Sequence, residues 1–99
     1  MENNNAEKAT ELFSYKGYPL VRKGNEIYYG NASDEFVIYI QILGSENIGD
    51  LKVANRLRVM RMLTDNSVSP LERITKQVEK TSLYEALEIA NIWLSRAAG

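Results

Sequence analysis

The stretch Phe36-Val-Ile-Tyr-Ile-Gln-Ile-Leu43 decides the fold of this chain. It contains no Gly or Pro, and β-branched and aromatic residues dominate it, which is typical of a β-strand. Side chains alternate along a strand, so one face carries Phe36, Ile38, Ile40 and Ile42, and the other carries Val37, Tyr39, Gln41 and Leu43. Both faces are largely apolar, which predicts a central strand that is covered on both sides.

Two turn signals precede this strand and predict a small sheet region. Lys16-Gly17 marks one turn, and Gly24-Asn25 separates two short strands at residues 20–22 and 27–29. Gly-Asn between such runs is a hairpin signal, because Gly supplies the positive φ that a two-residue loop requires. Residues 31–34 form the next predicted turn, since Asn, Ser and Asp bond to their own backbone.

Residues 44–50 follow the core strand as a polar segment with two glycines, which predicts a connecting loop. We expect residues 56–64 to form a strand that pairs antiparallel with the core strand. For residues 51–55 two interpretations stay open: a continuation of that strand, or a loop.

The last third of the chain predicts two helices. Ser69, Pro70 and Glu72 have the spacing of an N-cap, a first helical position and a capping box, so a helix is expected over residues 70–80. Ser82 and Glu85 repeat the capping box ahead of a wide apolar face, which predicts a helix over residues 83–97.

These elements predict an α+β fold: an antiparallel β-meander of about four strands, followed by two C-terminal helices packed on one face. The chain has 99 residues, of which 44% are hydrophobic and 25% charged, as in ordinary globular domains. We expect residues 1–11 to form a flexible N-terminal segment and residues 12–99 to form a single domain.

The residue types that the chain lacks restrict its chemistry. It contains no Cys and no His, so it lacks the commonest general base, the thiolate and the imidazole ligands of transition metals. No Gly-rich phosphate loop or calcium-binding loop is present. We therefore expect a protein that is not an enzyme, with no catalytic residues, cofactor or metal.

The formal net charge of −1 gives no general attraction to nucleic acids or anionic membranes. No apolar run is long enough to span a bilayer, and the first residues are polar and acidic, unlike a signal peptide. These observations predict a cytoplasmic protein without a membrane partner.

Two stretches resemble a group of known proteins. Residues 15–30, Tyr-Lys-Gly-Tyr-Pro-Leu-Val-Arg-Lys-Gly-Asn-Glu-Ile-Tyr-Tyr-Gly, and residues 83–94, Leu-Tyr-Glu-Ala-Leu-Glu-Ile-Ala-Asn-Ile-Trp-Leu, are similar to small uncharacterised single-domain proteins of anaerobic Gram-positive bacteria, a domain of unknown function. The resemblance implies a bacterial cytoplasmic protein of one domain. It implies no activity and no binding residues.

A sheet with both helices on one face leaves its other face uncovered. That face would expose an apolar patch, which on a soluble protein indicates an interaction site. The candidate interface residues are Val37, Tyr39, Leu43, Met60 and Met62. We expect a protein-interaction module that forms a homodimer through this face, since twofold dimers are the commonest assembly, although a different protein partner is also compatible.

Two alternatives stay open. A nucleic-acid-binding accessory protein would use the basic residues Lys52, Arg56, Arg58 and Arg61, with tyrosines as stacking surfaces. We do not expect nucleic acid to be the main partner, because strand tyrosines are usually half-buried sheet residues. The second alternative is a small-ligand-binding domain with a pocket between sheet and helices.

Overall fold

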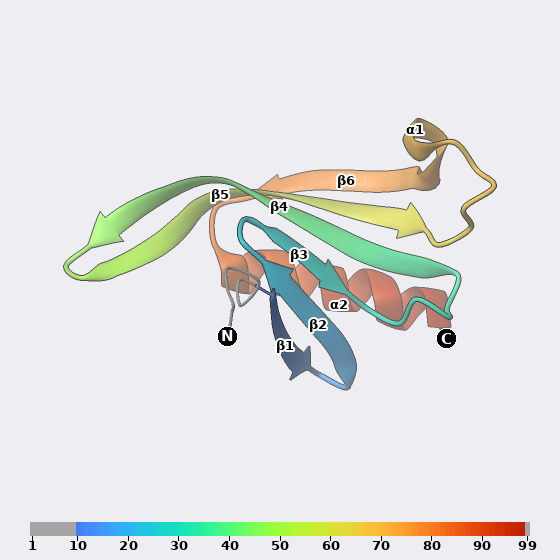
Figure 1. The fold of residues 1–99 in the computed structure, drawn as a ribbon, viewed down its shortest axis with the longest axis horizontal. Helices are drawn as coiled ribbons and strands as arrows, with labels where there is room; N and C mark the ends of the chain where they lie inside the picture. The colour runs from blue at the N-terminus through green and yellow to red at the C-terminus, as the bar shows by residue number, and fades with distance from the viewer. Residues whose placement is uncertain (1–9, 99) are drawn as a thin grey trace, which may run out of the picture.

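A computed structural model describes residues 10–98 of the chain. Six strands form one antiparallel sheet in the order β1-β2-β3-β4-β5-β6, so every strand pairs with its neighbours in the sequence (Figure 1). The strands are β1 (Thr10–Tyr15), β2 (Tyr18–Lys23), β3 (Glu26–Tyr29), β4 (Phe36–Ile48), β5 (Leu51–Leu63) and β6 (Ile74–Lys80), and the helices are α1 (Pro70–Arg73) and α2 (Leu83–Ala98). The expected α+β meander is confirmed, with six strands rather than about four.

Three two-residue loops connect the N-terminal and central hairpins. Lys16 and Gly17 both have positive φ angles, 49° and 88°, as a type I′ turn requires. In the Gly24-Asn25 loop, as predicted, the first residue has the positive φ, and the same holds for Gly49-Asp50. These loops join strands directly and so favour a continuous meander.

The hairpin of β4 and β5 is longer than the sequence predicts. Residues 44–50, expected as a connecting loop, continue β4 to Ile48, and residues 51–55 begin β5. The loop prediction was wrong because Gly49-Asp50 alone makes the turn, which leaves the flanking residues free to pair. Pairing irregularities at Gly44 mark where this hairpin leaves the sheet, and residues 45–54 beyond them project as an arm, on the left in Figure 1.

The helix predicted over residues 70–80 is also wrong beyond its first turn. Helix α1 ends at Arg73, and β6 follows and pairs with β5. Without β6, the outer edge of β5 would leave its backbone N–H and C=O groups without sheet partners. The β-branched residues Ile74, Thr75 and Val78 favour a strand there, and tertiary pairing outweighs the helix-start signal at Ser69 and Pro70.

Helix α2 confirms the prediction for residues 83–97. The backbone N–H of Glu85 donates to the hydroxyl of Ser82 over 3.1 Å, which is the expected N-cap bond. Its apolar face buries Ala86, Ala90, Trp93 and Leu94 against the sheet. The buried strand residues beneath it are Leu20, Ile27, Tyr29, Ile38, Ile40, Ile42, Leu57 and Val59.

The helix therefore covers the face of β4 that carries Ile38, Ile40 and Ile42. Among residues 10–98, α2 is the element that packs across the sheet, and it does so on this face alone (Figure 1). We call the opposite face, which carries Val37, Tyr39, Met60 and Met62, the open face.

Candidate interaction surface

An apolar row crosses the open face from strand to strand. Each residue of the row lies directly opposite the next across a pair of neighbouring strands, from β1 to β6. The row contains Leu12, Val21, Tyr28, Tyr39, Met60 and Gln77. Directly opposite side chains on one face contact each other, so the apolar side chains of five strands form one continuous row.

A charged row runs beside the apolar row, two residues away along each strand. It contains Lys23, Glu26, Gln41, Arg58 and Glu79, again in direct register from β2 to β6. The Arg58 guanidinium lies 3.6 Å from the Glu79 carboxylate, and both side chains are about half exposed to solvent. The open face therefore combines an apolar strip with a strip of alternating charge.

The aromatic centre of the apolar row is packed but accessible. The rings of Tyr28 and Tyr39 stack with centroids 4.9 Å apart. Tyr28 is 45% exposed, whereas Met60 is only 5% exposed even though it lies outside the core under α2. Burial raises the pKa of the Tyr39 phenol, so this group is neutral over the physiological range.

The structure brings four of the five predicted interface residues together. Val37 lies opposite Met62, and Tyr39 opposite Met60, on adjacent strands of the open face. Leu43 lies apart from them, at the irregularity where the arm begins. All five are half-buried except Met60, which is buried.

Sequence reasoning missed three members of the apolar row: Leu12, Val21 and Tyr28. Leu12 is the most exposed of them, at 77%. The signal was available for the last two, because the Gly24-Asn25 hairpin loop fixes the register of its strands and places Val21 opposite Tyr28. Leu12 could be found only through β1, which the sequence did not predict as a strand.

The four basic residues proposed for nucleic-acid contact do not share one surface. Arg58 lies on the open face, and Arg61 lies on the opposite face, since an odd number of positions separates them. The Arg61 guanidinium sits 4.1 Å from the centre of the Phe36 ring, and its Nε donates to the hydroxyl of Thr75 over 2.8 Å. Lys52 is on the arm, and Arg56 is at its base.

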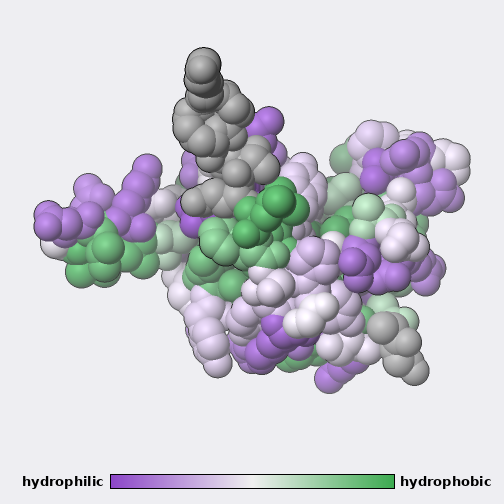
Figure 2. Space-filling model, turned by 60° about the horizontal axis from the view of Figure 1, so that its bottom comes forward, coloured by the Kyte–Doolittle hydropathy of each residue, from purple (hydrophilic) through white to green (hydrophobic). Residues whose placement is uncertain are grey.

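The arm carries a second exposed apolar surface, which the sequence analysis did not anticipate. Ile48 pairs with Leu51 and Glu46 pairs with Val53, so Ile48, Leu51 and Val53 lie on one side of the hairpin. Ile48 is 58% exposed and Leu51 68%. Figure 2 shows apolar surface gathered along one side of the arm, at the left of the view, and polar surface along the other.

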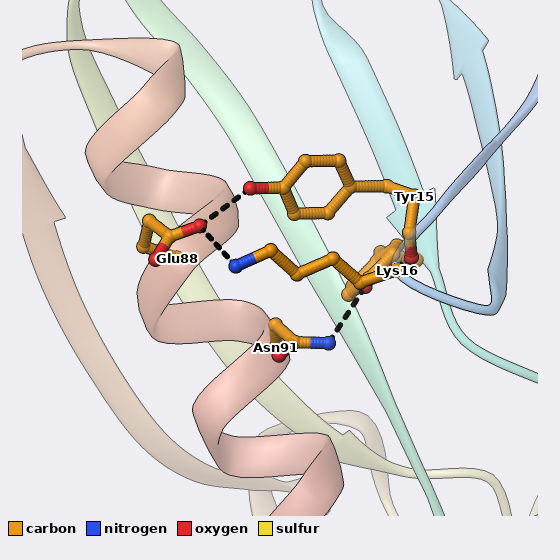
Figure 3. Close-up of polar contacts among 5 residues, drawn as sticks. Tyr15, Lys16, Glu88 and Asn91 are labelled. Carbon is orange, nitrogen blue, oxygen red and sulfur yellow. Dashed lines mark hydrogen bonds and ion pairs between the residues drawn. The ribbon is translucent and has the colours of Figure 1, made fainter.

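A polar cluster fastens the hairpin of β1 and β2 to helix α2 (Figure 3). The Glu88 carboxylate accepts hydrogen bonds from the Tyr15 hydroxyl over 2.5 Å and from the Lys16 ammonium over 2.8 Å. These hydrogen bonds lower the pKa of Glu88, and the bond to Glu88 raises the pKa of Tyr15. The Tyr29 hydroxyl donates to the backbone carbonyl of Tyr15 over 2.7 Å and accepts from the Asn91 amide over 3.1 Å.

Each side chain of this cluster thus makes a hydrogen bond to another group of the same chain. The cluster holds Lys16 in its left-handed backbone conformation and joins the turn to the helix. Its hydrogen bonds link the hairpin of β1 and β2 to α2.

The hollows of the described surface have volumes between about 270 and 440 Å³. The one between the C-terminal end of α2 and the start of β4 has a volume of about 270 Å³ and is lined by Tyr18, Asp34, Glu35, Phe36, Leu94 and Ala97. Typical ligand pockets measure roughly 300–1,000 Å³. Within residues 10–98, no group of three or more acidic side chains is placed to hold a metal ion.

Comparisons with protein-family models, with curated proteins and with solved structures give no match for this chain. Neither helix in the described residues is long and apolar enough to cross a membrane.

Proposed function

We propose that this protein is a non-enzymatic cytoplasmic interaction module that self-associates through the open face of its sheet. The observation that carries the proposal is the apolar row of Leu12, Val21, Tyr28, Tyr39 and Met60, which crosses five strands in register on the face opposite α2. Contiguous apolar surfaces of this kind on soluble domains mark interaction sites.

The composition of the face supports a protein partner. Tyrosine and methionine are enriched in protein interfaces, charged residues are depleted from the interface core, and the rim is polar. Here Tyr28, Tyr39 and Met60 form the centre, and the charged row flanks them. The stacked tyrosines supply large contact area with few rotatable bonds, so little conformational entropy is lost on association.

A second copy of the chain is the proposed partner. Closed twofold dimers are the commonest assemblies of soluble proteins, and they use the same patch on both subunits. A single sheet with a helix on one side becomes a layered structure, helix–sheet–sheet–helix, when two copies meet at their open faces.

We do not extend the proposal to nucleic acid. The four basic residues Lys52, Arg56, Arg58 and Arg61 do not converge on one face of the sheet, and two of them bond to groups of their own chain.

The test is the solution mass as a function of concentration. Sedimentation equilibrium from about 1 to 500 µM covers the dissociation constants expected for small interfaces. We expect a rise from the monomer mass toward twice that value. A monomer mass over the whole range would contradict the proposed function.

A pair of matched variants locates the contact. Tyr28→Lys places a charge in the apolar row, whereas Tyr84→Lys makes the same change on α2, where Tyr84 is 69% exposed. We expect Tyr28→Lys to abolish the mass increase and Tyr84→Lys to leave it unchanged. Equal effects of the two changes would exclude the open face as the contact.

A further inference from the structure

The charged row on the open face has a self-complementary order of charges. The apolar row has no such property. Read from β2 to β6, the row carries a positive, a negative, a neutral, a positive and a negative side chain, in the order Lys23, Glu26, Gln41, Arg58 and Glu79. Reversing the order of this row brings an opposite charge to each charged position and leaves Gln41 facing itself.

We infer that two copies pack face to face about a twofold axis that runs along β4 and passes by Tyr39 and Gln41. This inference rests on the proposed function and specifies its partner and orientation. The axis exchanges β3 with β5 and β2 with β6, so Glu26 faces Arg58 of the second copy, and Lys23 faces its Glu79. Each contact occurs twice in the dimer.

The apolar row fits the same axis. Tyr39 meets its own copy at the axis, and Tyr28 faces Met60 of the second copy. An axis perpendicular to the strands and along the apolar row would instead bring the charged row onto the row of Val37 and Met62, where no charge compensates it, and one along the charged row would bring each charge against its own copy. The requirement that charges be matched at an interface therefore selects the axis parallel to the strands.

The twist of the sheets limits which contacts form. Packed sheets are rotated by about 30° relative to each other, and strands are about 4.8 Å apart. Glu26 and Arg58 lie one strand away from the axis, so this rotation displaces them by only about 2.4 Å, which long side chains accommodate. Lys23 and Glu79 lie two strands away and are displaced by about twice as much.

The area of the face is compatible with a dimer. With a rise of about 3.3 Å per residue, the six strands without the arm present roughly 600 Å² per copy. The pair would bury roughly 1,200 Å², which is the lower limit of standard stable interfaces.

Charge reversal tests the axis. In a dimer of Glu26→Lys, the introduced ammonium group faces the Arg58 guanidinium of the other copy at two symmetric contacts. In a dimer of Arg58→Glu, the introduced carboxylate faces the Glu26 carboxylate of the other copy, again at two symmetric contacts. We expect each variant to self-associate at least about tenfold more weakly than the wild type, because like charges that face each other at an interface are strongly unfavourable. A mixture of the two variants in equal amounts forms matched pairs at both sites, so we expect the mixture to dimerise with about wild-type affinity.

Sedimentation of the wild type, the two variants and their mixture separates the outcomes. A wild type that is monomeric at every concentration overturns the proposed function and this inference with it. A wild-type dimer that either reversal leaves intact, or a mixture that fails to recover, overturns the inferred axis while self-association stands.

The variants remain informative if one of them does not fold. Circular dichroism and Trp93 emission report folding, since Trp93 is buried under the sheet. Lys23→Glu and Glu79→Lys form a second pair on exposed side chains. Because these side chains lie farther from the axis, we expect each variant to weaken self-association less than the first pair does, and their mixture to recover wild-type affinity.

Discussion

Ile40→Ala tests the assignment of the covered and uncovered parts of β4. Ile40 is fully buried, pairs with Ile27 on one side and Val59 on the other, and lies on the face under α2. The matched control is Ile48→Ala, the same change in the same strand but on the arm, where the side chain is 58% exposed.

The expected magnitude follows from the atoms removed. The change deletes three carbons, and at about 0.8 kcal/mol each their transfer accounts for about 2.4 kcal/mol. A cavity adds to this, because β4 is bonded on both sides and cannot move in to fill the space; measured Ile→Ala changes in cores range over about 2–5 kcal/mol. We expect about 3 kcal/mol for Ile40→Ala, which lowers the melting temperature of a domain of this size by roughly 12–24 °C.

The assay is urea unfolding at low protein concentration, followed by the emission of the single tryptophan, Trp93. Trp93 is buried in the same core as Ile40, so its emission reports the loss of that core. For Ile48→Ala we expect about 0.5 kcal/mol or less, since surface changes rarely exceed this value.

Two results would refute the reasoning. A loss below about 1 kcal/mol at Ile40 would place that side chain outside the core. Similar losses at both positions would mean that the arm is packed rather than projecting, and the open and covered faces would have to be reassigned.

Two further predictions concern α2 and its contacts. Ser82→Ala should lower the free energy of unfolding by about 1 kcal/mol, because it removes the N-cap bond to Glu85, whereas Ser69→Ala should change it little, since the Ser69 side chain makes no cap bond in α1. Chemical denaturation of both variants checks this, and equal losses would argue against the cap. The second prediction is a pH dependence at Glu88, whose pKa lies below its ordinary value of 4.5 in the folded protein because Lys16 and Tyr15 hydrogen-bond to the carboxylate. A lowered pKa stabilises the fold above pH 4.5, and this stability is lost as the pH falls through the folded-state pKa. Glu88→Gln should therefore melt below the wild type at about pH 7, and the difference in melting temperature should narrow as the pH falls below 4.5; a difference that stays constant with pH would contradict it.

Several elements could be predicted from the sequence because short-range patterns specify them. The alternation of Phe36–Leu43 and its β-branched residues predict a strand whatever lies around it, and Gly24-Asn25 predicts a hairpin because of its backbone conformation. Ser82, Glu85 and the apolar face after them predict α2 in the same way. The strand at residues 56–64 and its antiparallel pairing with β4 were predicted, whereas the register that places Tyr39 beside Met60 and Val37 beside Met62 is given by the structure.

The tertiary structure alone decided what depends on the pairing of whole strands and on their register. Residues 74–80 follow a helix-start signal, yet they form β6, because pairing with β5 satisfies one side of their backbone and packs Val78 against the core. β1 forms because the turn at Lys16-Gly17 folds residues 10–15 back onto β2. The two rows of the open face exist only when the registers of all six strands act together, since a shift of one residue in any strand would move its side chains to the other face. For this reason the sequence indicated part of the candidate interface, and the complete surface with its complementary charges emerged from the fold.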